Sequence, residues 1–157
     1  MRLPTLLLSL LLALRVFSAP QPSGTDAPLA TADYDLAELV FRQYVSADAK
    51  CVYHLSYGTN DTVLPADFMT RFKGQSPLVR STPDGVTVVS NRFVLDKITR
   101  KEAIGLGIRQ LRVTGDKAEV QVLFFASGTS NSTRYYLVRE RGRWRVKDKK
   151  MEWIACG

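Results

Sequence analysis

Alternating hydrophobicity, interrupted by glycine-containing turns, dominates the C-terminal half of this 157-residue chain. Residues 108–114 and 117–125 are rich in β-branched and aromatic side chains, and they flank a turn that contains Gly115. Glycine tolerates the positive φ angle that a two-residue hairpin turn requires. Further along, Gly142 follows a second strand pattern at residues 134–139. Period-two alternation between turns of this kind predicts an antiparallel meander.

The N-terminal half has a different pattern, which predicts two helices before the meander. Apolar side chains recur at helical spacing within residues 32–49 and predict one amphipathic helix. Residues 51–57 alternate and predict a strand, and residues 86–95 are rich in β-branched side chains. Between them, Pro65 and Gly74 stand where proline opens and glycine closes a short helix.

Helices followed by hairpin-connected strands indicate an α+β domain, in which the N-terminal helix packs on a curled antiparallel sheet. We expect the polar residues 127–133 to form a loop in that sheet. The meander closes with Tyr136, Leu137, Val138, Gly142, Trp144 and Val146. This closing pattern and the order of elements over residues 32–155 resemble the NTF2-like (cystatin-like) superfamily. The resemblance implies a cone-shaped pocket between helix and sheet, but a fold alone does not transfer a function.

The first 18 residues have the pattern of a secretory signal peptide. Arg2 provides a short positive region, and an apolar run follows at residues 6–14. A membrane anchor, the alternative, needs about 20 apolar residues. We therefore expect cleavage after residue 18, a Pro-rich tether at residues 19–30 and a single domain at residues 31–157. The mature protein is then secreted, either extracellular or periplasmic.

Four side chains are candidates for lining the implied pocket: Tyr44, Tyr53, His54 and Tyr57. The resemblance gives a reason to consider them, because enzymatic members such as ketosteroid isomerases place an acid or base and a tyrosine in the pocket. His54 is the only histidine of the chain. A lone histidine in a strand is more often a hydrogen-bonded structural residue than a catalytic base. We therefore name no catalytic residue.

Basic residues gather in the last predicted hairpin. Removing the leader lowers the formal net charge from +7 to +5, so the mature chain stays basic. Arg139, Arg143, Arg145 and Lys147 form a candidate face for an acidic polymer. The alternative is a solvated outer face that keeps the strand edge soluble. Trp144 alternates with these cations and is expected to point inward.

The two cysteines, Cys51 and Cys156, are expected to form a disulfide, because an exported chain passes through an oxidising compartment. The sequence has no cluster of histidine and cysteine at zinc spacing and no calcium loop. We expect no cofactor and no metal.

Two tripeptides match the acceptor pattern for N-glycosylation, one at Asn60 and one at Asn131. We expect both asparagines to lie in polar loops. They would carry glycans if the chain passes through a eukaryotic secretory pathway.

Three hypotheses for function follow from these residues. The first is a secreted, non-catalytic module that binds a small apolar ligand. The second is an exported protein that binds a polyanion through the basic hairpin. The third is a pocket hydrolase or isomerase.

Overall fold

The structure is a computed structural model that describes residues 28–46, 50–81, 86–88 and 94–156. The predicted signal peptide and most of the predicted tether lie outside the described residues. Within the described ranges, no helix is long and apolar enough to cross a membrane.

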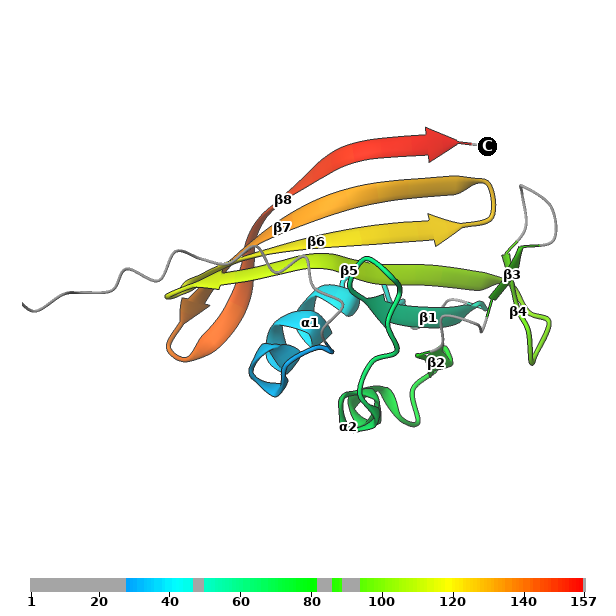
Figure 1. Ribbon diagram of the computed structural model, residues 1–157, viewed down its shortest axis with the longest axis horizontal. Helices are drawn as coiled ribbons and strands as arrows, with labels where there is room; N and C mark the ends of the chain where they lie inside the picture. Colours follow the sequence, from blue (N-terminus) through cyan, green and yellow to red (C-terminus); the bar gives the residue numbers. More distant parts are fainter. Residues whose placement is uncertain (1–27, 47–49, 82–85, 89–93, 157) are drawn as a thin grey trace, which may run out of the picture.

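The chain forms two short helices and eight strands within the described residues (Figure 1). The helical elements are η1 (Thr31–Asp33), α1 (Tyr34–Phe41), α2 (Ala66–Met69) and η2 (Thr70–Phe72). The strands are β1 (Val52–Tyr57), β2 (Val79–Arg80), β3 (Val86–Val88), β4 (Val94–Asp96), β5 (Ala103–Thr114), β6 (Lys117–Ala126), β7 (Thr129–Glu140) and β8 (Arg143–Cys156). The α+β class expected from the sequence is confirmed.

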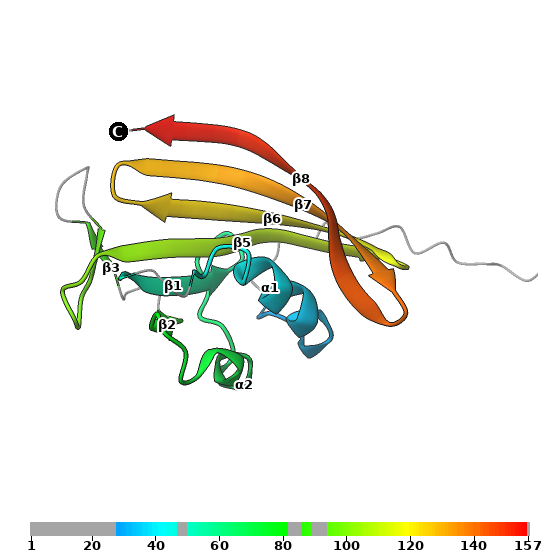
Figure 2. The same cartoon turned by 180° about the vertical axis from the view of Figure 1, so that it is seen from behind.

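Six strands form one sheet in the order β2-β1-β5-β6-β7-β8, and β3 pairs with β4 separately. The four long strands β5 to β8 form the expected antiparallel meander. β1, however, runs parallel to both β2 and β5. The prediction of a fully antiparallel sheet is therefore wrong. The physical reason is the long connection from β1 to β5, which lets the chain return and enter the sheet in the same direction. The sheet is also not strongly curled (Figures 1 and 2).

Helix α1 is shorter than the predicted helix. Beyond Phe41 the backbone tightens, with the Tyr44 amide donating to the Phe41 carbonyl at 3.0 Å. The hydroxyl of Tyr53 donates to the Tyr44 carbonyl at 3.0 Å. A side chain of β1 thus provides the hydrogen-bond donor for a carbonyl beyond the helix end. The strand therefore fixes where the helical segment ends.

The core lies between α1 and one face of the sheet. Leu36 and Phe41 of α1 are almost fully buried there, as is Leu55 of β1. Figure 2 shows α1 lying beside β5 and β1. The sheet contributes further apolar side chains to this cluster: Leu106, Ile108, Val120, Val122 and Leu137. Alternation along each strand places these side chains on one face, as the sequence pattern predicts.

The expected loop at residues 127–133 is instead a tight turn followed by strand. Ala126 pairs with Thr129, so only Ser127 and Gly128 connect β6 to β7. Gly128 has a φ of 77°, which a two-residue hairpin turn accommodates. Polar residues beyond it remain in a strand because they pair with β6 on one side and β8 on the other. Cross-strand pairing here overrides composition.

Trp144 points inward, as predicted, although it is only half-buried. It packs against the core together with Val146, and the guanidinium of Arg139 lies 4.5 Å from the centre of its ring. Arg143 and Arg145 alternate with it and are exposed. The two faces of this strand therefore contribute differently to folding.

We predict that Trp144→Ala lowers the free energy of unfolding by about 2 kcal/mol, below the roughly 3–5 kcal/mol typical of a fully buried aromatic side chain. The double variant Arg143→Glu, Arg145→Glu is the control, and it should change stability by only about 0.5 kcal/mol. Urea unfolding followed by circular dichroism measures both. A larger loss of stability in the charge-reversed variant than in Trp144→Ala would contradict the inward orientation of Trp144.

Candidate functional site

Three of the four predicted pocket residues lie together in the core, whereas His54 lies apart from them. Tyr53 and Tyr57 lie in the core on the α1 side, and Tyr44 packs against the same core from the end of the helical segment. Tyr44 stacks on Phe124 there, with 6.0 Å between ring centres. His54 alternates with the tyrosines along β1 and lies on the opposite face of the sheet. The space between helix and sheet is filled by these aromatic side chains.

His54 belongs to a buried polar network that joins three strands. Its Nε2 atom lies 3.0 Å from Oδ1 of Asp96, and the exposed fractions of the two side chains are 4% and 0%. The guanidinium of Arg80 also approaches this carboxylate, with Nε at 3.5 Å. The network thus links β1, β2 and the end of β4. Sequence reasoning missed both partners because they lie far from His54 in the chain.

The second oxygen of Asp96 is also satisfied. The backbone amide and the hydroxyl of Thr99 both donate to Oδ2 at 2.6 Å. Burial by itself would raise the pKa of Asp96, but the Thr99 donors, Arg80 and His54 together hold it below its ordinary value. The aspartate is therefore ionised at neutral pH. The Asp-x-x-Thr spacing was the one sequence signal that could have indicated this turn.

A second polar cluster lies two residues further along β1. The Ser56 hydroxyl donates to Oδ1 of Asp61 at 2.6 Å, and Arg109 forms an ion pair with the same oxygen at 2.9 Å. Arg109 also donates to the Gly58 carbonyl at 2.7 Å. A cavity of about 170 Å³ lies beside these residues and His54. Because the Ser56 hydroxyl donates to Asp61, these contacts fasten the segment after β1.

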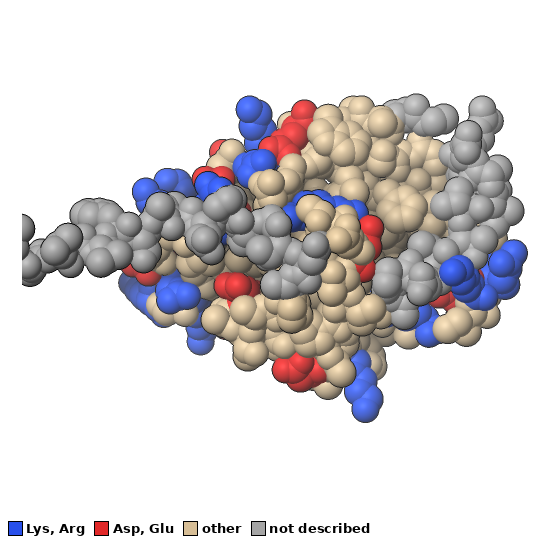
Figure 3. Space-filling model, viewed as in Figure 1, with Lys and Arg blue, Asp and Glu red and all other residues tan. Residues whose placement is uncertain are grey.

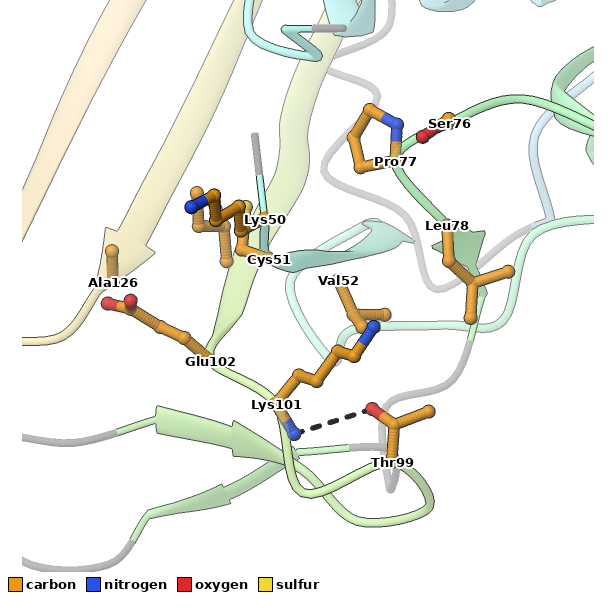
Figure 4. A pocket seen from close by; sticks show the side chains of 11 residues that line it. Lys50, Cys51, Val52, Ser76, Pro77, Leu78, Thr99, Lys101, Glu102 and Ala126 are labelled. Carbon is orange, nitrogen blue, oxygen red and sulfur yellow. Dashed lines mark hydrogen bonds between the residues drawn. The ribbon is translucent and has the colours of Figure 1, made fainter. Parts of the chain in front are cut away.

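A cavity of about 930 Å³ lies where β1 and β5 begin and β6 ends (Figure 4). Its lining comes from Lys50, Cys51, Val52, Ser76, Pro77, Leu78, Thr99, Lys101, Glu102, Ile104 and Ala126. Most of this lining is contributed by segments that meet only in the folded chain. The pocket therefore lies at one end of the sheet and not between helix and sheet.

The walls of this end pocket are mainly apolar. Val52, Leu78 and Ile104 provide aliphatic surface, and Pro77 follows a cis peptide bond. Burial raises the pKa of the Cys51 thiol, so this group stays protonated at neutral pH. Such a surface can hold an apolar body but offers no thiolate nucleophile.

The charged groups of the end pocket lie on two sides of it. Figure 4 shows Glu102 and Lys50 on the side of Ala126, whereas the Lys101 side chain extends toward Val52 and Leu78. In the described ranges, none of the three charged side chains is in an ion pair.

The predicted polyanion face is only partly free for binding. Arg139 covers Trp144, and Arg145 lies 3.8 Å from a carboxylate oxygen of Glu140. Arg143 and Lys147 are exposed and have no ion-pair partner among the described residues. Figure 3 shows basic residues gathered at the end of the molecule where the β7–β8 hairpin lies, next to acidic ones. The cationic surface is therefore smaller than the sequence count implies.

The expected disulfide is not supported by this topology. The described residues contain no disulfide, and Cys51 is a free, half-buried thiol. The side chain of Cys156 lies outside the description, but its backbone pairs with Thr129 in β7. Cys51 precedes β1, which is four strands away from β8 and hence roughly 19 Å away across the sheet. Disulfides join Cα atoms about 4.4–6.8 Å apart. Strand order, which sequence does not reveal, separates the two cysteines.

The two glycosylation motifs lie in different environments. Asn60 is exposed in the turn after β1, as expected of a loop residue. Asn131 is half-buried within β7, where it pairs with Phe124 of β6 and Ile154 of β8. Its expected place in a loop is therefore wrong, for the same reason as the loop at residues 127–133. Glycosylation at either asparagine stays a prediction.

Comparisons with known proteins identify no relative: no family model, no curated protein and no solved structure matches the chain. In the part of the chain that the structure describes, no group of three or more histidine, cysteine, aspartate or glutamate side chains could hold a metal ion.

We predict that Asp96→Asn lowers the free energy of unfolding by about 3 kcal/mol at pH 7, because Arg80 loses the buried carboxylate charge that it faces and the contact with His54 is weakened. The pKa of Asp96 is lower in the folded chain than the ordinary 3.8. Its stabilising contribution is therefore present above that pH and is lost as the pH falls through the folded value. Asp116→Asn, in an exposed turn, is the control. Equal acid sensitivity of the Asp96→Asn variant and the unaltered protein would contradict this role.

Proposed function

We propose that this protein binds a small, mainly apolar ligand in the end pocket, without catalysing its conversion. The observation that carries the proposal is the size and lining of the pocket. Ligand sites are typically clefts of about 300–1,000 Å³ with apolar walls and a few polar groups that fix orientation. A cavity of about 930 Å³ between Val52, Leu78 and Ile104 fits that description.

A binding role agrees with the chemistry of the lining better than catalysis does. The thiol of Cys51 is the nucleophile that the pocket offers, and burial raises its pKa away from the reactive thiolate. Asp96 contacts the ring of His54, as a carboxylate does when it orients a histidine base. His54, however, lies in the separate network with Arg80 and does not line the end pocket. The described lining thus supplies apolar surface and charged groups and does not include the His54–Asp96 pair.

We also propose that this chain is a secreted domain of NTF2-like type. The order of its elements, α1 and β1 followed by the four-stranded meander β5 to β8, supports that family. The leader-like pattern of residues 1–18 supports export. The parallel pairing of β1 and the pocket at the end of the sheet depart from the fully antiparallel sheet and the central pocket that the resemblance implied.

Filling the end pocket should abolish ligand binding without unfolding the domain. We predict that apolar probes raise the melting temperature of the unaltered protein, with a stabilisation of about 2.7 kcal/mol at a ligand concentration 100 times the Kd. Ala126→Phe, on the pocket wall, should remove this response. Val113→Phe, exposed at the far end of β5, is the matched control and should retain it. No stabilisation by any probe would refute the proposal, as would an undiminished response in Ala126→Phe.

A second candidate function, binding of an acidic polymer, is favoured by one observation. Arg143 and Lys147 are exposed at the β7–β8 hairpin and have no ion pair among the described residues. Exposed cations of this kind attract polyanions in a manner that salt weakens. Arg145 adds to the same face of the hairpin.

We predict that Arg143→Glu combined with Arg145→Glu abolishes retention on heparin at low salt while the melting temperature stays nearly unchanged, because both side chains are exposed. Lys73→Glu combined with Lys97→Glu changes the net charge equally at other exposed positions and should reduce retention less. Heparin affinity chromatography over a salt gradient gives the comparison. The same loss in both double variants would mean that net charge alone, and not the hairpin, governs retention.

A further inference from the structure

The charges around the end pocket indicate what kind of ligand it takes. Three charged side chains line it: Lys50, Lys101 and Glu102. Over the described ranges none of them is ion-paired with another residue. Two positive charges against one negative charge give the pocket a positive excess, and a cavity with low-dielectric walls strengthens the field of such an excess.

The three charges are not equivalent in position. Glu102 and Lys50 lie on the side of Ala126, so their fields oppose each other there (Figure 4). The ammonium group of Lys101 is on the other side and extends toward Val52 and Leu78 (Figure 4). The Lys101 side chain therefore extends along the apolar part of the wall, and among the described residues it forms no ion pair.

The turn that carries Lys101 is held by the Asp96 network. The Asp96 amide donates to the Lys101 carbonyl at 2.9 Å, and the Arg100 amide donates to the Asp96 carbonyl at 2.9 Å. The side chain of Asp96 accepts two further bonds from Thr99. Lys101 thus projects from a backbone that is fastened on both sides of it, which reduces the ordering cost of binding a charged group.

We propose that the ligand of the end pocket is an anionic amphiphile, a molecule with an apolar chain and a single negatively charged head group that the Lys101 ammonium binds. This inference rests on the proposed function and names its ligand class. The apolar chain lies against Val52, Leu78 and Ile104. The head group carries one charge and not two, because Glu102 in the same pocket repels additional negative charge.

Three probes with the same apolar chain and different head groups test the inference: octanoate, 1-octanol and octylammonium. Calorimetric titration of the full mature chain at low ionic strength gives a Kd for each. We expect octanoate to bind most tightly and octylammonium most weakly, and we expect the preference for octanoate to shrink as salt is added. All three bind if only the apolar chain is recognised.

Variants assign the preference to one side chain. Lys101→Met keeps the aliphatic stem and should weaken octanoate binding about five-fold, the upper range for a solvent-exposed ion pair. It should leave the Kd of 1-octanol unchanged. Glu102→Gln removes the opposing charge and should tighten octanoate binding. Lys117→Met, exposed at the start of β6, is the matched control and should match the unaltered protein.

The outcomes separate the two proposals. Equal binding of octanoate and 1-octanol, or an octanoate Kd that Lys101→Met does not change, would overturn the anionic head group and leave the proposed apolar pocket intact. Failure of all three probes to bind would overturn both. Circular dichroism of Lys101→Met checks that its fold is retained. Loss of octanoate binding in Glu102→Gln, which still contains Lys101, would also count against the inference.

Discussion

The buried carboxylate of Asp96 is the interaction on which the parallel part of the sheet depends. It is fully buried and ionised, and it accepts hydrogen bonds from Thr99 and lies against His54 and Arg80. A buried charge without such partners would cost several kcal/mol. Because each partner comes from a different segment, satisfying this one group brings β1, β2 and the turn after β4 together. The same turn presents Lys101 to the end pocket.

The sheet is buried on both faces at β1, and this explains where the pocket lies. Every residue of β1 is buried, with Leu55 facing the α1 core and with His54 and Ser56 covered from the other side. Large aromatic side chains fill the space under the helix. Gly105 on β5 has no room for a Cβ atom, because the ring of Phe125 lies against it. Little space remains along the sheet, so the large cavity is at its end, where strands begin and stop.

Sequence reasoning succeeded where local physics decides the structure. The alternation in β8 correctly placed Trp144 on the core side and Arg143 on the outside. It failed where pairing between strands decides. Residues 129–133 look like a loop in composition but are held as a strand between β6 and β8. The position of His54 opposite the tyrosines followed from alternation, but its partner Asp96 could not, because a contact across 42 residues leaves no local pattern.

The sequence by itself determined the α+β class, the antiparallel meander, the inward orientation of Trp144 and the abundance of exposed cations at the last hairpin. These properties follow from periodicity and turn chemistry, which act over a few residues. Only the tertiary structure decided that β1 pairs in parallel with β5, that Cys51 and Cys156 are four strands apart, and that Lys101 meets Val52 at one pocket. These depend on which distant segments become neighbours, and that choice is made by burying apolar surface and neutralising Asp96 across the whole domain.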